Sequence, residues 1–116
     1  MTAAANFKLV TRTSNSLDQP TKAIIGLHGW TGDEHDFEPV AKMFHIDDAQ
    51  WFFPRAPYKA DSGKGYSWFS GTDETGWDIE KTRVGIHQLL VDIRSEGFSP
   101  KNIFLVGFSQ GASLAM

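Results

Sequence analysis

The sequence predicts an α/β fold: a mostly parallel sheet with helices on both faces, in a single domain over residues 1–116. Three short, unbroken apolar runs, at residues 23–27, 50–53 and 102–106, have the pattern of strands that are buried on both faces. Helical patterns separate these runs, and such alternation is typical of a parallel sheet with right-handed crossovers. A chain of 116 residues can bury a core but has room for one domain only.

The first half of the chain predicts an edge strand, a turn, a buried strand and a helix. Residues 6–13 alternate loosely between apolar and polar side chains and predict a short edge strand, and the polar stretch 14–21 predicts a turn. A helix is expected from Asp36 to about His45, because apolar side chains recur there at helical spacing. Pro39 fits the first turn of this helix, where its missing N–H costs little.

The second half begins with a long loop. Residues 55–76 combine glycines with aromatic side chains and predict a loop that packs on the rest of the fold. A helix follows, with Asp78 as its expected N-cap and Gly97 and Pro100 as its stop signals. Its expected apolar stripe comprises Ile79, Ile86, Leu89, Leu90 and Ile93. Residues 112–116 open a further helix without a stop signal, so we expect that the chain is cut there.

Composition excludes several classes of function. The chain has 11 Lys and Arg against 14 Asp and Glu, a net charge of −3, which gives no electrostatic reason to bind nucleic acid. It has no cysteine, so disulfides, thiolate zinc sites and iron–sulfur sites are excluded. We find neither a signal peptide nor an apolar run of the roughly 18–20 residues that span a bilayer. We therefore expect a soluble, cytoplasmic protein without a stable membrane anchor.

The strongest chemical signal is Gly-x-Ser-x-Gly at residues 107–111, between a predicted strand and a predicted helix. This is the nucleophile-elbow pattern of α/β-hydrolases, although the five residues alone can match by chance. The sharp turn pushes the Ser109 hydroxyl above the sheet edge, and glycines at both flanking positions avoid crowding it. The N–H groups at the helix start favour negative charge at the same place. We therefore expect Ser109 to be a catalytic nucleophile, in a fold truncated after the elbow.

A second signal, His-Gly-Trp-Thr-Gly at residues 28–32, directly follows the first buried strand. A tetrahedral intermediate needs N–H donors aimed at its oxyanion. We assign these donors to the backbone N–H groups of Gln110, the residue after the nucleophile, and of Trp30. The alternative for residues 28–32 is a plain glycine-rich turn between a strand and a helix.

With these residues the chain resembles the carboxylesterase/phospholipase family, which includes the acyl-protein thioesterases. Four blocks in this order carry the resemblance: Leu27–Trp30, Asp36–Ala41, Phe53–Pro57 and Gly107–Gly111. The resemblance runs from about residue 22 to the end, whereas residues 61–70 do not closely match the better-known members. It implies an α/β-hydrolase fold and hydrolysis of carboxylic esters, lysophospholipids or acyl thioesters without a cofactor. It also implies that Ser109 is the nucleophile and that Trp30 and Gln110 supply the oxyanion N–H groups.

Two departures from this family stand out. The family more often has Leu where Trp30 stands, which leaves the backbone role intact and is expected to narrow the acyl pocket. The triad order in this fold is Ser, then Asp or Glu, then His, but only seven residues follow Ser109 and none is acidic or His. Among the upstream histidines, we expect His28 to brace its turn by hydrogen bonding and His87 to lie on a helix remote from the strand ends. We expect His35 and His45 to be solvated.

The remaining chemistry-bearing residues allow more than one interpretation. The acidic run Asp33–Glu38 is expected to be the solvated start of a helix, and no spacing of His28, Asp33 and His35 matches a metal site. The aromatic side chains of the long loop, among them Trp68 and Phe69, either bind substrate in an acyl pocket or bury the loop on the sheet.

Two functions from different classes follow. The first is a serine hydrolase that acts on small acyl esters or thioesters, of which this chain is the N-terminal half. The second is a truncated or split chain that catalyses nothing and binds a complementary segment or a second copy. In either case the apolar strand at 102–106 would be an open edge, which we expect to be covered by the missing half or by a second copy across a two-fold axis.

Overall fold

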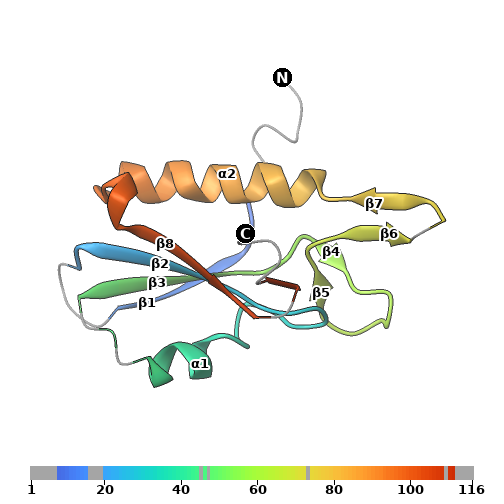
Figure 1. Ribbon diagram of the computed structural model, residues 1–116, viewed down its shortest axis with the longest axis horizontal. Coiled ribbons are helices and arrows are strands. Elements are labelled where there is room, and N and C mark those ends of the chain that lie inside the picture. Colours follow the sequence, from blue (N-terminus) through green and yellow to red (C-terminus); the bar gives the residue numbers. More distant parts are fainter. Residues whose placement is uncertain are drawn as a thin grey trace.

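The computed structural model describes residues 8–15, 20–44, 46, 48–72, 74–108 and 110–111. Its centre is a four-stranded sheet in the order β1-β3-β2-β8, formed by Thr11–Asn15, Ala49–Pro54, Lys22–Leu27 and Ile103–Gly107 (Figure 1). β2 pairs in parallel with both β3 and β8, whereas β1 is antiparallel to β3. The predicted α/β fold is therefore confirmed, and β2 lies between β3 and β8.

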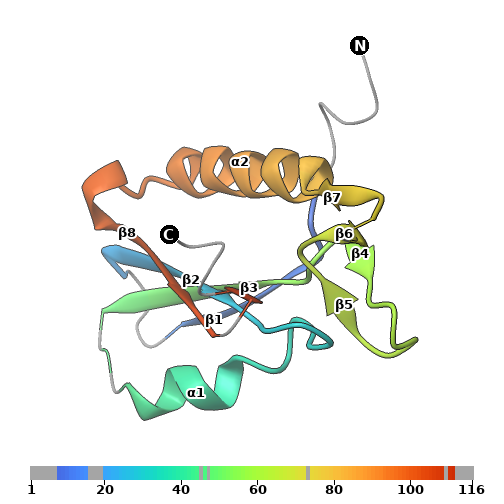
Figure 2. The same ribbon diagram turned by 45° about the vertical axis from the view of Figure 1, so that its right-hand side comes forward.

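Helices cover both faces of this sheet (Figure 1, Figure 2). α2, Glu80–Ser95, lies over one face, and the short α1, Glu38–Met43, lies under the other. β2 contributes side chains to the core on both faces of the sheet. Ile25 and Leu27 belong to the core beneath α2, and Ile24 belongs to a second core cluster with Phe37, on the face that α1 covers. The unbroken apolar run of β2 is thus explained by burial on both faces.

For three elements, the observed bounds differ from those predicted from the sequence. The edge strand occupies Thr11–Asn15 rather than 6–13, of which residues 6 and 7 lie outside the described part of the chain. α1 is shorter than the expected helix from Asp36, and His45 lies outside the described residues. α2 begins one residue later than expected, because Ile79 is its N-cap, although an Asp78 carboxylate oxygen accepts the Glu80 N–H at 2.9 Å. The stop at Gly97, with φ of 107°, is as predicted.

The long loop predicted at 55–76 contains two small hairpins instead of irregular chain alone. β4, Tyr58–Lys59, pairs with β5, Tyr66–Ser67, and β6, Ser70–Thr72, pairs with β7, Gly76–Asp78. Both lie beside one end of the main sheet (Figure 2). A 3₁₀ turn, η2 at Pro100–Asn102, then leads into β8.

β8 differs from the other parallel strands, because it is the last strand of the sheet. Phe104 is 45% exposed and Leu105 is 37% exposed, so the expectation of a strand buried on both faces is wrong for β8 within the described chain. Among the described residues, no strand pairs with its outer edge. Within the same residues, no helix is long and apolar enough to cross a bilayer.

We expect the 116-residue chain to self-associate through the outer edge of β8, because an open apolar strand is a template for pairing. Size-exclusion chromatography with light scattering measures this. Phe104→Lys should shift the chain toward monomer, since a lysine on an edge strand disfavours edge-to-edge pairing. Val91→Lys, which adds the same charge on the exposed side of α2, should not. A well-ordered monomer of the unaltered chain would contradict this expectation.

Candidate active site

The two sequence motifs meet at the carboxyl ends of neighbouring parallel strands. The Phe108 N–H donates to the Leu27 carbonyl at 3.1 Å, and the Gly111 N–H donates to the Phe108 carbonyl at 3.0 Å. A Cβ atom at Gly111 would lie 2.6 Å from the His28 carbonyl oxygen and closer still to that of Leu27. The residues on both sides of Ser109 therefore lie against the 28–32 turn, while Ser109 itself is outside the described residues.

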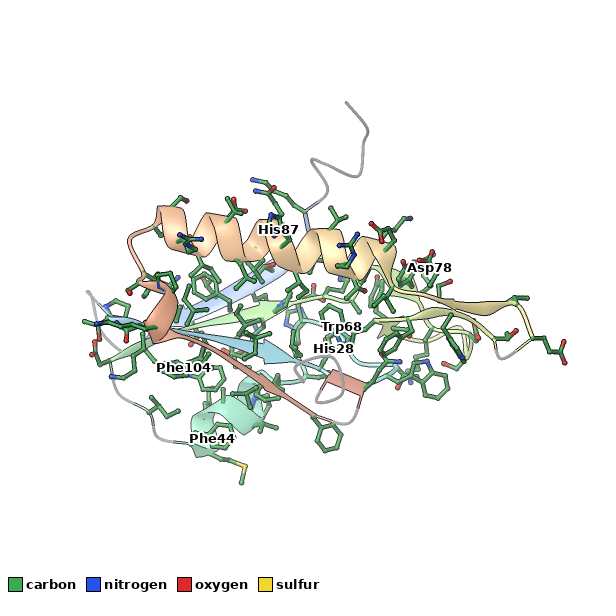
Figure 3. All side chains as sticks on the ribbon, turned by 45° about the horizontal axis from the view of Figure 1, so that its top comes forward. His28, Phe44, Trp68, Asp78, His87 and Phe104 are labelled. Atoms are coloured by element: carbon green, nitrogen blue, oxygen red, sulfur yellow. The ribbon has the colours of Figure 1, made fainter. Side chains whose placement is uncertain are left out.

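His28 braces this turn, as the sequence predicts. Its ring is buried and stacks on Trp68, with 5.0 Å between ring centroids (Figure 3). The ring Nε2 accepts the Ala56 N–H at 3.0 Å, so the proton of the neutral ring lies on Nδ1, which donates to the Gly29 carbonyl at 2.7 Å. Burial lowers the pKa of His28 below 6.5, since it disfavours the charged ring. The imidazole thus links the turn to the segment that follows β3.

The 28–32 turn is held from the other side by the loop around Tyr66. Thr31 has a φ of 70°, in the left-handed region, which costs a non-glycine residue about 1–3 kcal/mol. Its N–H donates to the Tyr66 carbonyl at 2.9 Å, and the Tyr66 N–H donates to the Gly32 carbonyl at 3.0 Å. A side chain at Gly65 would collide with the Thr31 backbone. The strained turn and the loop therefore fix one another.

The acidic run contains an ion pair that is missing from the sequence-based predictions. Glu34 is only 6% exposed, and its carboxylate accepts two bonds from Arg55, from Nε at 2.9 Å and from Nη2 at 2.7 Å. These bonds lower the pKa of Glu34 to about 2. The Arg55 guanidinium also lies 4.7 Å from the centre of the Tyr66 ring. The prediction of a solvated helix start is thus wrong for Glu34.

Two other carboxylates of the acidic run, those of Asp36 and Glu38, also have partners. Glu38 pairs with Arg12 of β1, and an Asp36 carboxylate oxygen accepts the Asp33 N–H at 3.2 Å. The sequence does indicate that Arg55 has an acidic partner, although it does not identify Glu34 as that partner. Arg55 directly follows the buried strand β3, where a lone cation needs an acidic partner nearby.

A hollow of about 300 Å³ lies beside the elbow. Its walls are Trp30, Lys59, Asp61, Ser67, Phe69, Trp77 and Gln110. Phe69, a candidate substrate-binding residue, is thus one of the walls of this hollow. The two residues with predicted oxyanion N–H groups, Trp30 and Gln110, line the same hollow.

Trp68 does not line this hollow. It is 0% exposed, belongs to the core beneath α2, and its indole N–H donates to the His28 carbonyl at 2.8 Å. This placement fits the alternative in which an aromatic side chain buries the loop on the sheet, rather than contact with substrate. A second hollow, of about 250 Å³, lies on the other side of the turn, between Phe37, Val40 and Phe108.

The other two described histidines, His35 and His87, are exposed. The prediction that His35 is solvated is confirmed, since its side chain is exposed; its Nε2 lies 4.0 Å from the Glu34 carboxylate. His87 is exposed on α2, well apart from His28 and Trp68 (Figure 3). The prediction for His45 falls outside the described residues. Within the described part of the chain, no cluster of His, Cys, Asp or Glu could hold a metal ion.

The buried His28 ring predicts a pH dependence of stability. Because its folded-state pKa lies below the ordinary value of 6.5, the unfolded chain takes up this proton first. The contribution of His28 is fully present above pH 6.5 and is lost as the pH falls through that value. Urea unfolding at a series of pH values should show a shallower loss for His28→Gln than for the unaltered chain. His87→Gln is the exposed control, and equal slopes for the two variants would refute the assignment.

Comparison with known proteins places these motifs in a family. The family model described as phospholipase/carboxylesterase matches residues 10–116. The carboxylesterase SOBER1 of Arabidopsis thaliana is 28% identical over 108 residues, which covers 80% of this chain and 47% of that protein. The chain thus spans about half the length of this relative.

Solved structures show the same fold. The esterase PE8 superposes with a TM-score of 0.76 at 24% identity, covering 94% of this chain and 57% of that one. Acyl-protein thioesterase 2 of Zea mays superposes with a TM-score of 0.63 at 20% identity, covering 91% and 48%. With its sheet order, its two turns and the family match over residues 10–116, the chain belongs to the phospholipase/carboxylesterase family and has the α/β-hydrolase fold.

Proposed function

We propose that this chain supplies the nucleophile and the oxyanion hole of a serine hydrolase that acts on carboxylic esters or acyl thioesters. One observation carries the proposal. The backbone on both sides of Ser109 packs against the 28–32 turn, through the Phe108 bond to Leu27 and the close approach of Gly111. An oxyanion hole needs N–H donors from two such segments around one point.

The proposed reaction has two halves. The Ser109 oxygen attacks the acyl carbonyl carbon while a histidine base takes the hydroxyl proton, and that base then protonates the leaving alcohol or thiol. Water attacks the acyl-serine in the same way and releases the carboxylic acid. In both halves the carbonyl oxygen becomes an oxyanion, which the backbone N–H groups of Trp30 and Gln110 stabilise. These steps need no metal and no organic cofactor.

The hollow beside the elbow is the proposed acyl site. Trp30, Phe69 and Trp77 give it aromatic walls, which suit the apolar part of an acyl ester. Trp30 is 51% exposed and forms part of both hollows, so its side chain limits the width of the entrance. We assign this activity to the cytoplasm, as the composition suggests.

The rival function, an inactive chain that only binds a partner, is not favoured by membership in an esterase family. Fluorophosphonate labelling distinguishes the two functions. Intact-mass spectrometry should show one slow adduct on the folded chain, absent in Ser109→Ala and retained in Ser113→Ala. Ser113 is the control, because it lies in the same segment outside the elbow motif. An adduct that survives Ser109→Ala, or no adduct on the folded chain, would contradict the proposal.

Stoichiometric labelling is not turnover. Because no Asp, Glu or His follows Ser109 in these 116 residues, the serine hydroxyl lacks the base that the triad order supplies. We expect p-nitrophenyl acetate hydrolysis by this chain to be no faster than hydrolysis by its Ser109→Ala variant. A faster rate that disappears in Ser109→Ala would mean that a base is present within these residues.

A further inference from the structure

One fully buried residue joins the two turns to the core. The Trp68 backbone N–H donates to the side-chain oxygen of Gln110 at 2.7 Å, and its indole N–H donates to the His28 carbonyl at 2.8 Å. The Trp68 carbonyl accepts the Thr82 hydroxyl of α2 at 2.6 Å. Thr82 is itself buried, so this last bond anchors Trp68 to a rigid helix. Trp68 thus connects the elbow, the 28–32 turn and α2.

The Gln110 side chain completes this connection with both ends of its amide. Its oxygen accepts the Trp68 N–H, so its NH₂ group faces the Ser67 hydroxyl, to which it donates at 3.2 Å. The Ser67 hydroxyl hydrogen is directed to the Phe69 carbonyl at 2.7 Å. Donors and acceptors therefore alternate along the segment 67–69, and the orientation of the amide is fixed.

We propose that Gln110 is a positioning residue through its side chain: the amide ties the elbow to residues 67–69 and thereby holds the backbone N–H of Gln110 in place. This inference rests on the proposed function, in which that N–H stabilises the oxyanion. The side chain is placed to act on its own backbone, because Gly111 on one side already contacts the Leu27 and His28 carbonyls. With the amide anchored to residues 67–69, Gln110 is restrained both through its side chain and through the residue that follows it.

The chemistry of the tether predicts which substitutions keep it. Glutamate retains an oxygen that accepts the Trp68 N–H, and the Ser67 hydroxyl can turn to donate to its second oxygen. Asparagine is one methylene too short to reach the Trp68 N–H, and leucine has no acceptor. The order of tether strength is therefore Gln and Glu above Asn and Leu. Shape alone would not produce this order, because leucine fills nearly the same space as glutamine.

Amide hydrogen exchange, followed by NMR on the 116-residue chain, tests the tether directly. We expect the Trp68 N–H to exchange about tenfold faster in Gln110→Leu and Gln110→Asn, since loss of one hydrogen bond has about this effect. Gln110→Glu should keep the protection of the unaltered chain. Gln88→Leu is the matched control, because Gln88 is half-buried and its amide donates to Asp92 within α2. All variants are compared at one pH.

The rate of fluorophosphonate labelling tests the positioning role. Inhibitor affinity and the maximal labelling rate are separated by varying the inhibitor concentration. In Gln110→Leu we expect the maximal rate to fall about tenfold with little change in affinity, the pattern of a lost transition-state interaction. Gln88→Leu should change neither quantity.

The outcomes separate this inference from the function on which it rests. Unchanged Trp68 exchange in Gln110→Leu overturns the tether, and faster exchange with an unchanged maximal rate overturns the positioning role. If the unaltered chain is not labelled at Ser109, the proposed function fails, and the positioning role fails with it. The exchange result still shows in that case whether Gln110 holds residues 67–69.

Discussion

The site depends on one close approach, in which the backbone at Gly111 lies against the carbonyl groups of Leu27 and His28. Only glycine permits it, because any Cβ there would overlap main-chain oxygen atoms that cannot move independently. The approach follows from the sheet, since β2 and β8 are parallel neighbours and their carboxyl ends meet at one edge. The parallel pairing of β2 and β8 brings the two turns to the same edge of the sheet, and the absence of a side chain at Gly111 allows their backbones to approach closely.

The surrounding residues hold the 28–32 turn in place, although its backbone is strained at Thr31. Thr31 adopts a left-handed conformation, and its N–H and the Gly32 carbonyl both bond to the Tyr66 backbone. The buried His28 ring and the Glu34–Arg55 pair tie the same turn to the chain after β3. Such over-determination is what allows strained backbone to persist at a functional site. The long loop is thus a structural brace for the turn as well as a wall of the hollow beside the elbow.

Local patterns in the sequence predicted the fold and the motifs well. The runs at 23–27 and 50–53 are buried strands, because burial on both faces leaves a continuous apolar signature. The partners of Glu34 and Gln110 could not be found in this way, since Arg55 is 21 residues from Glu34 and Trp68 is 42 residues from Gln110. The sequence leaves open whether Trp68 binds substrate or buries the loop, because aromatic residues in a loop look alike in sequence, whether they line a pocket or fill a core. Only the register of the loop on the turn distinguishes them.

The most direct test of this account is Gly111→Ala, followed by amide exchange at Phe108, whose N–H bonds to the Leu27 carbonyl. A methyl group at this position must push the elbow away from the turn. We predict faster exchange of the Phe108 N–H and loss of fluorophosphonate labelling at Ser109. Gly85→Ala is the control, because the nearest atoms to its added methyl belong to the Leu9 side chain and not to main-chain carbonyl groups. Unchanged exchange and labelling in Gly111→Ala would contradict the claim that this contact builds the site.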